Sequence, residues 1–116
     1  MNIYHGFFDL KQDVSDVGFA DDLARFLDWL KSGGKIESWR LMRRKLGLGP
    51  AEMGEFHLMI ETHDLAQLDD AFNLAATRSG EVEQKHFDVN SKIKSIRFAL
   101  YRDFPDPVRE RGNEKF

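Results

Sequence analysis

The chain has 116 residues, no cysteine and a net charge of -3, from 17 basic and 20 acidic residues. This length suits one domain with its own core, and the lack of cysteine excludes disulfides, thiolate metal sites and a cysteine nucleophile. The acidic balance argues against nonspecific binding to nucleic acid, and no apolar run approaches the about 20 residues that span a bilayer. We therefore expect a single cytoplasmic domain over residues 1–104 and a polar tail over residues 105–116.

Strand and helix patterns alternate along the first half of the chain. Residues 2–9 are rich in β-forming side chains and predict a first strand. From Ser15, which can cap a helix, apolar residues recur at spacings of three and four, and Gly33 and Gly34 end that stripe. Alternation then predicts a second strand over residues 35–46.

The second half repeats this order with the strand first. Residues 54–62 alternate between apolar and polar side chains and predict a third strand. Asp64 caps a second apolar helical stripe, which we expect to close at Gly80. Residues 81–92 indicate only a further helical turn, and a fourth strand follows over residues 93–102.

The resulting order, βαββαβ, is typical of the ferredoxin-like α+β fold, with an antiparallel sheet in the order 4-1-3-2 and both helices on one face. The fourth strand should turn its apolar side chains, Ile96, Phe98 and Leu100, toward the helices. In the first strand either the odd or the even positions can face the helices. We favour the even set because Gly6 permits close approach of a helix, and this orientation places His5 beside His57 on the open face.

Four apolar side chains would then lie on the uncovered face of the sheet, where a second copy can cover them: Ile3, Phe7, Met42 and Met59. In this the chain resembles the dimeric α/β-barrel superfamily. Residues 39–50 (WRLMRRKLGLGP), 55–64 (EFHLMIETHD) and 98–107 (FALYRDFPDP) resemble an uncharacterised family of small bacterial proteins of that kind. The resemblance implies a homodimer but no particular activity. No motif aligns with the oxygenases, haem-degrading enzymes or isomerases of the superfamily, so we expect no cofactor.

The open face carries the candidate catalytic residues. His5 and His57 can act as a general base and its partner, and Tyr101 can donate a proton to a carbonyl or oxyanion. The alternative is that the histidines form an interface hydrogen bond and that the tyrosine only packs. We expect His63 and His86 on the solvated surface, and we expect no metal site because metal binding needs further ligands.

Arg40 and Arg97 of the same face are the candidate ligand anchors, since a guanidinium holds a carboxylate or phosphate bidentately. Met59 adds an apolar contact. The alternative is a structural ion pair of the arginines with Glu61, with Asp9 or across a dimer.

Two functions remain open at this stage. The first is a homodimer that binds a small anionic or carbonyl-containing organic molecule, between sheet and helices or within the barrel. If it is an enzyme, cofactor-independent oxygenation or proton abstraction fits these residues best. The second is a non-catalytic binding or interaction domain whose polar sheet face is structural.

Overall fold

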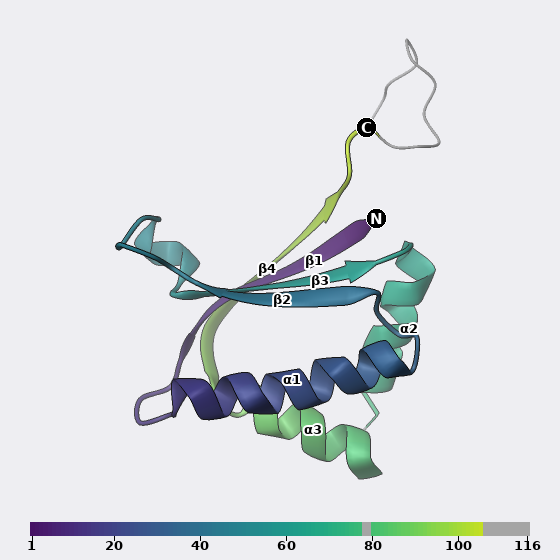
Figure 1. The fold of residues 1–116 in the computed structure, drawn as a ribbon, viewed down its shortest axis with the longest axis horizontal. Helices are drawn as coiled ribbons and strands as arrows, with labels where there is room; N and C mark the ends of the chain where they lie inside the picture. Colours follow the sequence, from purple (N-terminus) through teal and green to yellow (C-terminus); the bar gives the residue numbers. More distant parts are fainter. Residues whose placement is uncertain (78–79, 106–116) are drawn as a thin grey trace.

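A computed structural model describes residues 1–77 and 80–105. The elements in chain order are β1 (Asn2–Leu10), α1 (Asp16–Ser32), β2 (Ser38–Arg43), the 3-10 turn η1 (Ala51–Met53), β3 (Phe56–Thr62), α2 (Leu65–Ala75), α3 (Gly80–Asn90) and β4 (Ile93–Arg102). The four strands form one antiparallel sheet in the order β2-β3-β1-β4, which read from the other edge is the predicted 4-1-3-2. Figure 1 shows all three helices on the same side of this sheet. The predicted ferredoxin-like α+β fold is confirmed.

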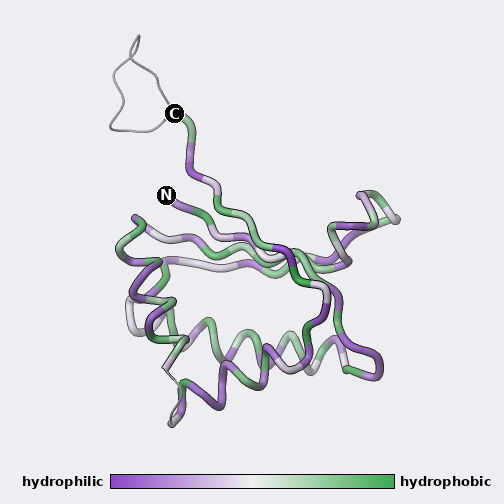
Figure 2. The backbone as a smooth tube through the Cα atoms, turned by 180° about the vertical axis from the view of Figure 1, so that it is seen from behind, coloured by the Kyte–Doolittle hydropathy of each residue, from purple (hydrophilic) through white to green (hydrophobic). Residues whose placement is uncertain are grey.

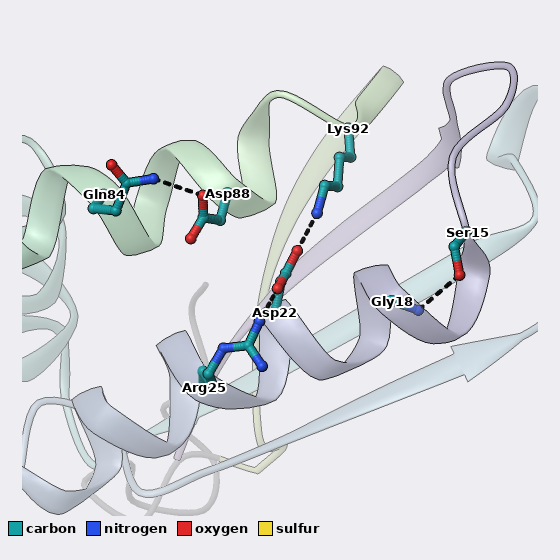
Figure 3. Close-up of polar contacts among 7 residues, drawn as sticks. All are labelled: Ser15, Gly18, Asp22, Arg25, Gln84, Asp88 and Lys92. Atoms are coloured by element: carbon teal, nitrogen blue, oxygen red, sulfur yellow. Dashed lines mark hydrogen bonds and ion pairs between the residues drawn. The ribbon is translucent and has the colours of Figure 1, made fainter.

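Helix α1 forms as its sequence predicts. The Ser15 hydroxyl accepts a hydrogen bond of 3.0 Å from the backbone N–H of Gly18, which satisfies one free donor of the first turn (Figure 3). At the other end Gly34 adopts a φ of +72°, a conformation that glycine adopts without strain. Between these ends polar and apolar residues alternate along the helix (Figure 2), and the apolar stripe turns toward the sheet.

The core lies between α1 and the sheet. Phe8 of β1 and Phe19 of α1 are completely buried, with ring centroids 5.5 Å apart, and Phe56 of β3 lies 5.7 Å from Phe8. The even positions of β1 therefore face the helices, as predicted. This orientation leaves the odd positions, including His5, on the opposite face.

Three predicted boundaries were wrong. Strand β2 is shorter than the expected 35–46. Helix α2 ends at Ala75 and not at Gly80, which instead begins α3 with a φ of +67°. Residues 80–90 form a full helix where only a turn was expected, because a helix this polar shows little amphipathic contrast in the sequence and is held mainly by packing against α1.

The helix-facing side of β4 also differs from the prediction. Ile96, Phe98 and Leu100 face the helices but remain 38%, 59% and 53% exposed. Their strand is an edge of the sheet, whereas α1 and α2 contact β2 and β3. Alternation correctly predicted that these residues face the helices. It could not predict that the helices would not cover them.

Two further expectations concern the ends and surface of the molecule. The predicted tail, residues 105–116, lies outside the described residues apart from Pro105. Over residues 1–77 and 80–105, no helix is long and apolar enough to cross a membrane.

Candidate functional site

An apolar cavity of about 190 Å³ lies between the sheet and the three helices; we name it the inner cavity. Its walls come from β1, β3 and β4 on one side and from α1, α2 and α3 on the other. Only three polar side chains line it among the described residues, and none of them is a lysine, arginine, aspartate or glutamate: Tyr4, His86 and Asn90. A cavity with this lining suits a small, neutral and mainly apolar molecule.

Tyr4 is the polar group that β1 contributes to the inner cavity. Its ring packs edge-on against Phe72 of α2, with centroids 5.1 Å apart, and stacks on Phe98 of β4 at 5.5 Å. Burial raises the pKa of Tyr4 to about 12, so its hydroxyl is a proton donor throughout the neutral range. Within the described part of the chain this hydroxyl has no hydrogen-bond partner, which leaves it free for a ligand.

The mouth of the inner cavity lies between α2 and β4. Phe72 and Phe98 both line the cavity, yet they are 44% and 59% exposed to solvent. Since Tyr4 packs between these two rings, its side chain lies next to the entrance. A molecule that enters here crosses an aromatic rim before it reaches the apolar interior.

Helix α3 contributes the other two polar groups. The Nε2 atom of His86 lies 3.0 Å from the side-chain nitrogen of Asn90, one turn further along, and its ring lies 5.6 Å from that of Phe26. These contacts hold the imidazole between the inner cavity and an outer pocket between α2 and α3, which His86 and Asn90 also line. His86 is half-buried, so the expectation of a solvated surface position was wrong.

An ionic contact fixes α3 beside α1. Asp22 of α1 is nearly buried and accepts hydrogen bonds from Lys92, just beyond α3, and from Arg25 of its own helix (Figure 3). Gln84 and Asp88 join successive turns of α3 through a bond of 2.8 Å (Figure 3). Removing one partner of a largely desolvated ion pair destabilises a protein more than removing one partner of an exposed pair. The contact of Asp22 with Lys92 therefore helps to hold the α3 wall in place.

The opposite side of the sheet, which we name the open face, bears no helix. Its central feature is a hydrogen bond of 2.8 Å between Nδ1 of His5 and Nε2 of His57. The His57 ring also stacks on Phe7 at 4.2 Å, and the Tyr101 ring meets His5 edge-on at 5.0 Å. The structure therefore brings together all three predicted catalytic residues.

Burial lowers the pKa of His5, which is only 9% exposed. Burial and the neighbouring charge of His5 lower the pKa of His57. Both rings therefore favour the neutral form, and one of them donates to the other. Tyr101 is 62% exposed at the edge of this cluster.

The predicted ligand anchors are spread across the open face. Arg40 pairs with Met59 between β2 and β3, and Arg97 pairs with Phe7 between β4 and β1. The two arginines stand on opposite edge strands, separated by three strand spacings and by two residues along the strands, or roughly 16 Å. Over residues 1–77 and 80–105 neither has an ion-pair partner, so the suggested pairs with Glu61 or Asp9 do not form within this chain.

Comparison with known families gives a match over the whole chain. A model of a family of unknown function, DUF6614, matches residues 1–116. The chain belongs to this family. No curated protein matches it.

Several solved structures share the fold of this DUF6614 chain. At3g17210 from Arabidopsis thaliana has a TM-score of 0.72 at 4% identity, covering 89% of this chain and 95% of its own. A dimeric ferredoxin-like protein of unknown function from Jannaschia sp. CCS1 has a TM-score of 0.65 at 14% identity, covering 89% and 100%. SnoaB from Streptomyces nogalater, a cofactor-independent oxygenase, has a TM-score of 0.64 at 8% identity, covering 93% and 96%. At these identities the likeness shows the fold alone.

Sequence reasoning on this DUF6614 chain missed the polar groups of the inner cavity. Tyr4 was predicted only to face the helices, as one of the even positions of the first strand. His86 lies four residues after Val82 and three before Val89, which is the spacing of one helix face. Recognising α3 as a helix would have placed His86 on its inner side.

The unusual ionisation of Tyr4 can be measured directly. The chain has two tyrosines, so Tyr101→Phe leaves Tyr4 as the only group that absorbs as a phenolate. Because burial disfavours the charged form, we expect the ultraviolet titration of this variant to have its midpoint near pH 12 instead of about 10. A midpoint near 10, while circular dichroism still reports a folded chain, would contradict the buried position of the hydroxyl.

Proposed function

We propose that this protein binds a small, neutral, carbonyl-containing organic molecule in the inner cavity. The observation that carries the proposal is an apolar cavity of about 190 Å³ with a free, protonated phenol, Tyr4, beside its mouth. A cavity of about 150 Å³ already holds a benzene ring, so a single ring with a short substituent fits this size. Because no charged side chain lines the walls, a carbonyl suits the site better than an anion.

The polar groups of the cavity suit proton transfer next to that carbonyl. Tyr4 donates a hydrogen bond to the carbonyl oxygen, and the bond strengthens as negative charge develops there. His86 is the candidate base for a proton on the adjacent carbon, which its Nε2 atom takes up in exchange for the hydrogen bond that it accepts from the Asn90 side chain. This arrangement is consistent with an isomerase or a cofactor-independent oxygenase, the latter being the activity of the structurally similar SnoaB.

The open face supports a second function, the pairing of two copies of the chain. Ile3, Phe7, Met42 and Met59 are half-buried apolar residues of this face, and no element of the described chain covers them. The structurally similar Jannaschia protein is described as dimeric. In this proposal His5, His57 and Tyr101 form a polar centre of the interface, while Arg40 and Arg97 lie toward its two edges, where they can hold an anion or meet the partner copy.

The cavity proposal is tested with two probes of nearly equal shape, acetophenone and ethylbenzene, of which only the first carries a carbonyl. We expect both to bind the wild-type protein and acetophenone to bind more tightly in calorimetric titration. In Tyr4→Phe the preference for acetophenone should fall by roughly two- to tenfold, the value of one hydrogen bond. Binding of ethylbenzene should be unchanged, because the ring of residue 4 remains.

Gly6→Val provides the control for the position of the site. Gly6 lines the inner cavity, and an added Cβ would lie 3.7 Å from the Ile96 side chain, an ordinary van der Waals contact. A valine here fills part of the cavity without removing a polar group, so both probes should bind more weakly. Equal binding of the two probes to the wild type, or undiminished binding to Gly6→Val, would contradict the proposal.

A further inference from the structure

The hydrogen-bonded histidine pair at the centre of the open face has no part in the proposed cavity chemistry. His5 belongs to β1 and His57 to β3, and they are diagonal neighbours, since His5 pairs with Met59 and His57 with Phe7. Neutral imidazole both donates and accepts, whereas the protonated ring only donates. The bond of 2.8 Å between them therefore requires at least one neutral ring.

Over residues 1–77 and 80–105, no carboxylate lies within ion-pair distance of either ring, so no such contact favours their protonation. Six titratable or charged groups of the strands share the face with the two rings: Asp9 from β1, Arg40 from β2, Glu61 from β3, and Lys94, Arg97 and Tyr101 from β4. The helices lie on the other side of the sheet and contribute none (Figure 1). The strands of one chain thus place three positive charges and two negative charges on this face before either histidine takes up a proton.

Pairing two copies through this face would bring two such sets of charged residues together. The Phe7 ring stacks on His57, and the half-buried Ile3, Met42 and Met59 surround the pair, so a partner would exclude water from the imidazoles. Each proton taken up there would add a buried positive charge to a surface that already has an excess of arginine. That cost disappears when the copies separate and the rings meet water.

We infer that His5 and His57 make the pairing of two copies of this chain acid-sensitive, with the dimer stable at pH 8 and dissociating toward pH 5. The inference rests on the proposed pairing through the open face and is independent of the inner cavity. The single chain already lowers the pKa values of both histidines by burial, so their contribution to the folding stability of each copy is also present above about pH 6.5 and lost as the pH falls through the folded pKa.

The test is the dimer dissociation constant, measured by sedimentation equilibrium at pH 8 and pH 5, with circular dichroism to show that the chain stays folded. Excluding one proton per copy from rings that can take one up once the copies separate should weaken the dimer by on the order of tenfold per copy, or a hundredfold in all. The double variant H5Q/H57Q should dimerise equally at both pH values. His63→Gln changes an exposed histidine beyond the end of β3 and should keep the full pH effect.

Four results would overturn the inference. A wild-type dimer of equal strength at pH 8 and pH 5 would refute the acid sensitivity while leaving the pairing intact. A monomer at pH 8 would refute the pairing through the open face. Unfolding in place of dissociation at pH 5 would refute the mechanism. A pH effect that persists in H5Q/H57Q would assign it to other groups. If the double variant does not fold, His57→Gln alone serves, and its pH effect must be smaller than that of the wild type.

Discussion

The variant Phe19→Ala should lose about 3–5 kcal/mol of unfolding free energy, the usual cost of removing a large aromatic side chain from a packed core. Phe19 is completely buried in the first turns of α1. Its ring lies 5.5 Å from Phe8 and 6.4 Å from Phe56, so the substitution leaves a void between α1 and two strands. A domain with 5–15 kcal/mol of total stability loses a large fraction of it in this way.

Phe87→Ala is the matched control, because it makes the same chemical change in another helix, α3, at a side chain that is 60% exposed. We expect it to change the unfolding free energy by no more than about 0.5 kcal/mol. Both variants can be followed by urea denaturation with tryptophan fluorescence, since the chain has two tryptophans. Similar losses in the two variants would show that Phe19 does not occupy the core.

The parts of the fold that could be predicted from the sequence are those with a local physical signal. The extent of β4, residues 93–102, was predicted from alternation over residues 95–101, and the start of α1 follows from a serine cap before an apolar stripe. Alternation alone left the orientation of β1 open, and Gly6 decided it in favour of the even positions. The reason given for Gly6 was incomplete, because its missing side chain leaves room in the inner cavity instead of admitting a helix.

The inner cavity could not be predicted, because it is a space left between elements and no residue pattern encodes it. Its mouth exists because α2 does not cover Phe98, and alternation states only the side on which Phe98 lies. Its second polar wall depends on α3, whose apolar residues are too few for a clear helical pattern. By contrast, the His5–His57 pair was predictable, since pairing of the two antiparallel strands brings these positions together whatever the helices do.

The last prediction concerns the segment just before β3, which packs against β1 at Phe8. Gly54 precedes β3 with φ of 77° and ψ of 178°, a backbone conformation that is essentially limited to glycine. A Cβ atom at this position would lie 2.7 Å from the carbonyl oxygen of Phe8 and 2.8 Å from its carbonyl carbon. Gly54→Ala must therefore strain the backbone and also push β1 away.

We expect Gly54→Ala to cost roughly 2–6 kcal/mol, about 1–3 from the backbone conformation and about 1–3 from the overlap. Gly47→Ala separates the two contributions, because Gly47 also has a positive φ, 66°, but an added Cβ would meet nothing within 4 Å. It should cost about 1–2 kcal/mol in the same urea titration. Because Phe8 is held by the β1–β3 pairing that also sets His5 beside His57, Gly54→Ala should weaken the acid sensitivity of pairing as well, whereas Gly47→Ala should not. Equal losses of stability in the two variants would show that the close approach to Phe8 carries no cost.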